Sequence, residues 1–129
     1  MKHTRSKDDK KVYRKVVTSE DFARFLGEVV HPVYSTFSLA RDAEWTTRQF
    51  VLDLREDDEE GIGTFITVEH KAPAFEGEEI TFNAYLEEVK NNEVICCVEA
   101  YVGTRMIAKG RTGQKILKRE NIKKLFQKP

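Results

Sequence analysis

The sequence has only two cysteines, Cys96 and Cys97, and they are neighbours in a strand-like run. Adjacent residues of a strand point to opposite faces of a sheet, and no second pair of cysteines is present to complete a zinc site. We therefore expect both thiols to be reduced packing residues, and we expect neither a metal centre nor a cofactor.

The sequence also lacks a long apolar run and an excess of charge of one sign. No stretch approaches the ~20 apolar residues that a membrane-spanning helix needs, and the charged start of the chain lacks the apolar segment of a secretory signal. Lys plus Arg and Asp plus Glu both number 22, so no overall field favours a nucleic acid or an anionic membrane. We expect a cytoplasmic protein with neither kind of partner.

The sequence contains enough hydrophobic residues to form one core. The chain has 129 residues, of which 40% are hydrophobic, which fits a single compact domain. Residues 1–10 are almost free of apolar side chains and cannot offset their ordering entropy. We expect them to be a disordered basic tail, followed by a single domain over residues 11–129.

The first part of that domain mixes two periodicities. Residues 11–17 alternate and predict a short strand. Residues 18–30, "TSEDFARFLGEVV", begin with a capping residue and acidic residues and place Phe22, Phe25 and Leu26 at helical spacing before Gly27. This pattern predicts a short helix or a lid segment.

A long helix is predicted from Ser35 or Thr36 to the acidic run at residues 55–61, "REDDEEG". Steps of three and four place six residues on one face, which we expect to turn inward. These residues are Phe37, Ala40, Glu44, Thr47, Val51 and Leu54.

From Gly61 onward the period changes to two and predicts four successive strands at residues 63–70, 79–89, 93–102 and 105–117. Two of them carry clear inward rows: Ile80, Phe82, Ala84 and Leu86, then Val94, Cys96, Val98, Ala100 and Val102. Residues 119–126 predict a short basic helix. The order fits an α+β fold in which an antiparallel sheet wraps around the long helix.

Two ionisable residues stand on faces that this fold presses together. Glu44 lies on the inward face of the long helix, where an ionised carboxylate is costly unless it is paired. His70 shares a strand face with Thr64, Ile66 and Val68. Together they can form a general acid/base pair. The alternatives stay open: Arg41 can neutralise Glu44 along the helix, and His70 can be a satisfied core residue.

Two smaller residues border the same region. Thr36 offers a hydroxyl near the N-terminus of the long helix, where the dipole favours developing negative charge, or it caps the helix together with Ser35. Gly63 opens the strand of His70 and lets a carbonyl group approach its backbone N–H, or it is a turn glycine after the acidic run.

The runs "STFSLARDAEW" and "GIGTFITVEHKAPAFEGEEITFNAYL" resemble the hotdog-fold acyl-CoA thioesterases of the fluoroacetyl-CoA thioesterase-like group. The resemblance extends from about residue 12 to the C-terminal helix. In that group a threonine, a glutamate eight residues later and a histidine twenty-six residues after the glutamate form the catalytic set. Thr36, Glu44 and His70 have this spacing.

The resemblance implies roles for these residues. Glu44 would attack the thioester carbonyl or activate water, His70 would move the proton, and Thr36 would orient Glu44 or the substrate. The N–H of Gly63 would donate to the oxyanion. Hotdog proteins are usually at least dimeric with sites between subunits, so a homodimer or a higher homo-oligomer is expected, with His70 working beside Glu44 of the other chain.

The resemblance also implies coenzyme A, whose phosphates call for cations near the site, and we expect Arg111 to bind substrate. Further candidates are Arg105, Lys109, Lys123 and Lys124. The group's aromatic gating residues are missing, because Gly27 and Val30 stand in the corresponding stretch, so fluoroacetyl-CoA is not the predicted substrate.

The predicted function is hydrolysis of a small or short-chain acyl-CoA thioester to the free acid and coenzyme A. The alternative is a hotdog protein that binds acyl-CoA without turning it over. A hydratase lacks support, because no aspartate and histidine are paired a few residues apart in the pattern of that class.

Overall fold

The computed structural model describes residues 1–2 and 9–129. Residues 3–8 of the expected tail lie outside the described residues, while Lys10 already belongs to the first strand. The elements in chain order are β1 (Lys10–Val16), a single 3₁₀ turn (Ser19–Asp21), β2 (Phe22–Phe25), β3 (Glu28–Tyr34), α1 (Thr36–Leu54), β4 (Glu59–His70), β5 (Glu79–Lys90), β6 (Glu93–Val102), β7 (Arg105–Lys118) and α2 (Arg119–Leu125).

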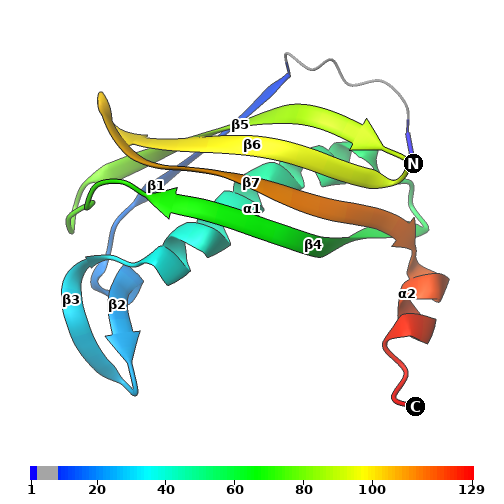
Figure 1. Cartoon of the computed structure of the whole chain (residues 1–129), viewed down its shortest axis with the longest axis horizontal. Coiled ribbons are helices and arrows are strands. Elements are labelled where there is room, and N and C mark those ends of the chain that lie inside the picture. The colour runs from blue at the N-terminus through cyan, green and yellow to red at the C-terminus, as the bar shows by residue number, and fades with distance from the viewer. Residues whose placement is uncertain (3–8) are drawn as a thin grey trace.

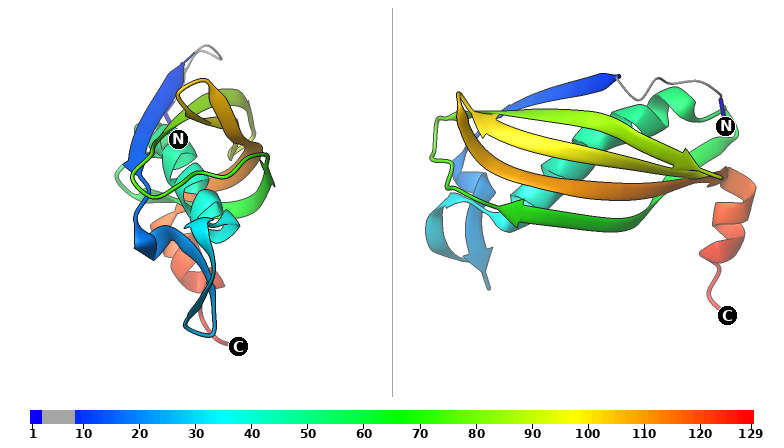
Figure 2. Two further views of the ribbon diagram at one scale, coloured as in Figure 1. Left: turned by 90° about the vertical axis from the view of Figure 1, so that its left-hand side faces the viewer. Right: turned by 45° about the horizontal axis from the view of Figure 1, so that its top comes forward.

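Five strands form an antiparallel sheet in the order β1-β5-β6-β7-β4. The sheet curves around α1, and a small hairpin of β2 and β3 projects from the N-terminal end of that helix (Figures 1 and 2). This arrangement confirms the α+β class and the sheet wrapped around a long helix.

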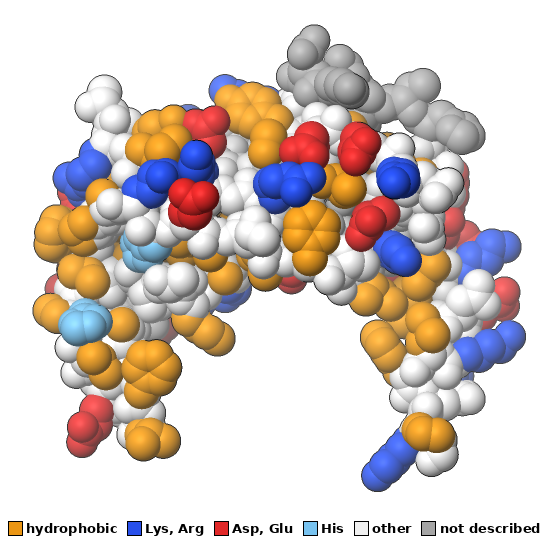
Figure 3. Space-filling view, in the orientation of Figure 1, with side chains coloured by type: hydrophobic (Ala, Val, Ile, Leu, Met, Phe, Trp, Pro, Cys, Tyr) orange, Lys and Arg blue, Asp and Glu red, His pale blue; other side chains and the backbone are white. Residues whose placement is uncertain are grey.

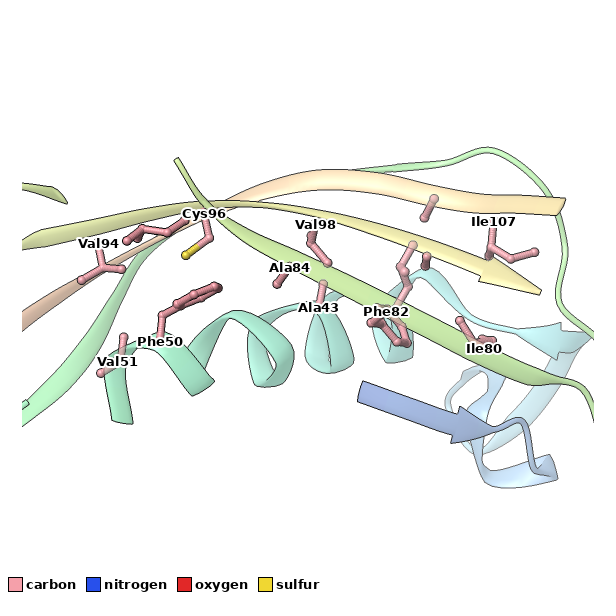
Figure 4. Close-up of a cluster of buried hydrophobic side chains, with 14 of the residues drawn as sticks. Ala43, Phe50, Val51, Ile80, Phe82, Ala84, Val94, Cys96, Val98 and Ile107 are labelled. Carbon is pink, nitrogen blue, oxygen red and sulfur yellow. The ribbon is translucent and has the colours of Figure 1, made fainter. Parts of the chain in front are cut away.

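The core lies between α1 and the inner face of the sheet (Figure 4). The predicted inward rows of β5 and β6 are buried, with Val102 only partly so. The buried side chains of α1 that pack against these rows include Leu39, Ala43, Phe50 and Val51. Because every second residue of these strands is apolar, the alternation alone fixes which face turns inward.

The segment at residues 18–30 is not a helix, and that prediction is wrong. Only the 3₁₀ turn follows Thr18, and β2 and β3 then pair as a hairpin. Leu26 and Gly27 have φ of 54° and 80°, which is the two-residue turn that matches the twist of paired strands. Gly27 therefore reverses the chain where a helix stop was expected.

The inward face of α1 is rotated from the predicted one. Thr47, Val51 and Leu54 are buried as expected, but Phe37 is 82% exposed and Glu44 is also exposed. Leu39, Ala43, Thr46 and Phe50 take the buried positions at the same helical spacing. The buried face of α1 therefore lies between the two stripes, and Phe37 and Glu44 stand at its edge.

Two further features concern the hydropathy of the helices and the state of the cysteines. No helix among the described residues is long and apolar enough to cross a membrane. Cys96 and Cys97 are both free thiols, and burial raises the pKa of Cys96 to about 12, as for a packing residue.

Candidate functional site

Thr36 and His70 are in contact within one chain. The Thr36 hydroxyl and Nδ1 of His70 are 3.0 Å apart and share a hydrogen bond. Thr36 is the first residue of α1, and His70 is the last residue of β4. The neighbouring Ser35 caps the helix, since its Oγ accepts a hydrogen bond from the Ser38 N–H at 2.9 Å. The Thr36 hydroxyl is therefore free of the capping role and available to the imidazole.

The imidazole of His70 is held in its neutral form. Burial lowers its pKa from the ordinary value of 6.5. Its second ring nitrogen, Nε2, is buried and has no hydrogen-bond partner among the described residues. An unpaired buried nitrogen of this kind is costly, and a substrate or water oxygen that reached it would remove the cost.

Glu44 lies beside Gly63. A Cβ atom built on Gly63 would lie 3.1 Å from Oε2 of Glu44, so the missing side chain leaves room for that carboxylate. Among the described residues, none forms an ion pair or a hydrogen bond with the Glu44 carboxylate, since the Thr47 hydroxyl bonds only the backbone carbonyl of Glu44. Arg41 does not neutralise Glu44, because its guanidinium bonds Asp21 and Asp42.

Thr36 with His70, and Glu44 with Gly63, form two separate pairs within a chain. Gly63 and His70 are seven residues apart on β4, a span of roughly 23 Å along an extended strand. Glu44 and Thr36 are eight residues apart on α1, about 12 Å along the helix axis. A carboxylate that rests against Gly63 therefore does not reach the imidazole of its own chain.

A buried ionic cluster next to Thr36 escaped the sequence analysis. Asp21 and Asp42 are 1% and 4% exposed, and Arg41 bridges them with contacts of 3.0 to 3.1 Å. The Tyr34 hydroxyl donates to Asp42 at 2.5 Å, and Lys15 lies 3.2 Å from Asp21. The helical step from Leu39 to Asp42 and Ala43, and on to Thr46, is the signal that could have revealed Asp42 as an inward residue.

The cluster sets the protonation of its own members. Burial on its own would raise the pKa of Asp21, but the Thr18 N–H and the cations Arg41 and Lys15 outweigh burial and hold the pKa below 3.8. Burial and the bond to Asp42 raise the pKa of Tyr34. Asp21 therefore stays ionised and Tyr34 neutral at physiological pH, which keeps the bonds to the start of α1 intact.

The structure separates Arg111 from the other predicted site residues. Thr112 bonds Thr47 of α1, so it faces the helix, and Arg111 next to it faces the outer side of the sheet. There its guanidinium lies over the Phe65 ring and bonds both carboxylate oxygens of Glu87. Of the other predicted cations, Arg105 pairs with Glu78 at 2.5 Å.

Comparison with known proteins decides the family. Residues 17–120 match the family model of the fluoroacetyl-CoA-specific thioesterases. The chain belongs to this family. A comparison with curated protein sequences found no significant match.

Solved structures of this thioesterase family and of other hotdog proteins have the same fold. A hypothetical protein of Thermus thermophilus, described as a thioesterase superfamily member, is 36% identical over 92% of this chain and 88% of its own, with a TM-score of 0.88. The fluoroacetyl-CoA thioesterase itself is 23% identical over 98% and 100% of the two chains, with a TM-score of 0.85.

A hot-dog-like protein from Thermanaerovibrio acidaminovorans is 17% identical over 94% and 93%, with a TM-score of 0.84. The fold of this chain is therefore the hotdog fold.

Proposed function

We propose that this chain hydrolyses an acyl-CoA thioester to a free acid and coenzyme A. The observation that supports it most is the hydrogen bond between the Thr36 hydroxyl and Nδ1 of His70, at the spacing to Glu44 that is typical of the family. Membership of a thioesterase family supports the reaction class in general. The size of the acyl group, the homodimer and the cytoplasmic location stay predictions.

The two residue pairs become one site if two copies meet along β4. This strand has twelve residues and lies at one edge of the sheet, above a wide hollow between the hairpin and α2 (Figure 3). An open edge of this length is a template for a second strand. Antiparallel pairing centred between Ile66 and Thr67 would set Gly63 of one copy opposite His70 of the other.

In that arrangement each half of the site supplies what the other lacks. One copy brings the neutral imidazole and its threonine, and the second brings an unpaired carboxylate and a glycine N–H. A two-fold axis repeats the same contacts, so a dimer would carry two equivalent sites. Glu44 would then reach the imidazole of the second copy, which it does not reach within its own chain.

The chemistry follows from these groups. In the water route, His70 takes a proton from water as the water adds to the thioester carbonyl carbon, and the Gly63 N–H stabilises the oxyanion. The bond between carbon and sulfur then breaks, and His70 gives the proton to the sulfur. In the covalent route, Glu44 displaces the thiolate and forms an anhydride; water activated by His70 then hydrolyses the anhydride, and His70 passes the proton to the thiolate.

The first test is release of free thiol from a panel of acyl-CoAs. Glu44→Gln and His70→Ala should each lower kcat by at least ~100-fold, the scale of a lost acid/base group. Glu120→Gln, an exposed carboxylate on α2, is the matched control and should have no effect. Binding of acyl-CoA without thiol release by the native chain would favour the binding protein instead.

Mixing the two inactive variants tests the composite site. A heterodimer of Glu44→Gln with His70→Ala has one site with both native residues and one site with neither. Random exchange between equal amounts of the variants should therefore restore about a quarter of the native activity, since half of the dimers carry one intact site of two. Activity that stays at the level of the single variants would show that each site lies within one chain.

A further inference from the structure

A groove lies between the hairpin and the first turns of α1. It encloses about 500 Å³, within the range of ~300–1,000 Å³ that is typical of pockets for whole small molecules. Its lining includes Phe22, Ala23, Phe25, Thr36, Phe37 and Arg41. Because Thr36 also bonds His70, the groove begins at the candidate catalytic pair.

The buried polar groups of the groove are already bonded within the protein. Ser35 Oγ accepts from the Ser38 N–H, and Ser38 Oγ donates to the carbonyl of Asp21. The Arg41 guanidinium is committed to Asp21 and Asp42. These groups have little bonding capacity left for the amides of a pantetheine arm or for a polar acyl group.

The rest of the lining is mostly apolar, although the exposed side chains of Glu20, Arg24 and His31 also border the groove. Phe25 is 74% exposed and Phe37 is 82% exposed, although both line the groove. Leu26, Val29 and Val30 of the same hairpin are exposed as well. Exposed apolar side chains that gather beside a candidate site mark a surface that a ligand or a partner covers.

We propose that this groove binds the acyl part of the substrate and selects bulky apolar acyl groups, meaning linear chains longer than butyryl or aromatic acyl groups. The inference rests on the proposed thioester hydrolysis and changes the expected substrate class. An acetyl group would leave most of the groove empty, whereas each further methylene would remove apolar surface from water on the walls formed by Phe25 and Phe37.

The test is kcat/KM for acetyl-, butyryl-, hexanoyl-, octanoyl- and phenylacetyl-CoA. Each fully buried methylene should raise kcat/KM by about fourfold. Octanoyl-CoA has four methylenes more than butyryl-CoA, so burial of only two of them should raise kcat/KM by at least about tenfold. Phenylacetyl-CoA should also exceed butyryl-CoA.

Variants locate the effect in the groove. Phe25→Ala and Phe37→Ala should flatten the dependence on chain length, while Val12→Ala, at an exposed valine on β1 at the sheet edge opposite β4, should not. Ala23→Phe should fill the groove and lower kcat/KM for octanoyl-CoA more than for acetyl-CoA. Circular dichroism shows whether each variant is folded.

The outcomes are distinct. Thiol release that is equal for all acyl groups, or highest for acetyl-CoA, would overturn this inference and leave the proposed hydrolysis standing. No release from any acyl-CoA would overturn the hydrolysis itself. If Phe25→Ala and Phe37→Ala weaken self-association and leave the chain-length profile unchanged, the second copy covers the groove and the inference is wrong.

Discussion

The two ends of β4 differ in how the charged side chains near them are paired. At the His70 end, the buried Asp21 and Asp42 both pair with the half-exposed Arg41, and Thr36 holds the imidazole. At the Gly63 end, Glu44 forms no ion pair with a described residue and stands exposed beside a glycine.

The difference teaches what each end contributes. Paired buried charges fix the geometry of the hairpin and the start of α1, since breaking such a network is costly. An unpaired, exposed carboxylate contributes little to folding and stays accessible to a substrate or to a second copy of the chain. The His70 end is therefore built to position groups, and the Gly63 end is built to present a charge.

Arg41→Met should produce the largest loss of stability at the His70 end. It leaves two buried carboxylates with fewer partners, although Lys15 and Tyr34 remain and Arg41 is itself half-exposed. We expect a loss of about 2–3 kcal/mol, somewhat below the ~3–5 kcal/mol for a fully buried pair. Urea unfolding measures it, and a loss below about 0.5 kcal/mol would show that the cluster does not hold this end.

This cluster also shows what the sequence could predict. The sheet strands after Gly61 were predictable because alternation with period two is direct evidence of a half-buried strand. The hairpin of β2 and β3 was not predictable, because Phe22, Phe25 and Leu26 also fit helical spacing. Only the positive φ of Leu26 and Gly27 distinguishes a hairpin from a helix here. Asp42 was missed because its burial depends on partners at Asp21 and Tyr34, which are distant in sequence.

Gly63→Ala, at the other end of β4, should lower activity and leave stability nearly unchanged. The new methyl group would lie 3.1 Å from Oε2 of Glu44 and displace the carboxylate by a few tenths of an ångström. We expect kcat to fall about tenfold, because small misplacements of a reacting group are costly, with stability changed by less than ~0.5 kcal/mol.

Combining Gly63→Ala with Glu44→Gln checks the cause. If the alanine acts through the carboxylate, the double variant should be no slower than Glu44→Gln, since both changes remove the same interaction. A further tenfold loss in the double variant would assign Gly63 a role of its own, such as the donor to the oxyanion.

The pH dependence of stability sharpens the contrast at His70. Burial lowers the pKa of His70 in the folded state below 6.5. At a pH between the folded and the unfolded pKa of His70, the unfolded chain therefore binds a proton that the folded chain does not bind. Stability should therefore fall as pH decreases from 6.5 toward the folded pKa. The decrease should be smaller in His70→Asn, measured by denaturant unfolding at pH 8, 7, 6 and 5. Equal pH profiles for the two proteins would contradict a buried neutral imidazole.

The sequence predicts which residues form the candidate site better than it predicts how they are arranged, and their roles stay predictions. Thr36 and His70 meet as the packing of a strand face on a helix predicts. Glu44 was placed on the inward stripe, yet the helix turns Leu39, Ala43 and Phe50 inward and leaves Glu44 at the edge. Periodicity gives the spacing of residues on a helix but does not give the rotation of the helix against a sheet.

Arg111→Met should have the smallest effect. Arg111 and Glu87 are both more than a third exposed, so their pair should contribute no more than ~1 kcal/mol to stability. Because Arg111 faces the outer side of the sheet, away from Thr36 and His70, kcat and KM for the preferred acyl-CoA should both stay within about twofold of the native values. A KM that rises severalfold with kcat unchanged would instead restore the sequence-based prediction that Arg111 binds the phosphates of coenzyme A.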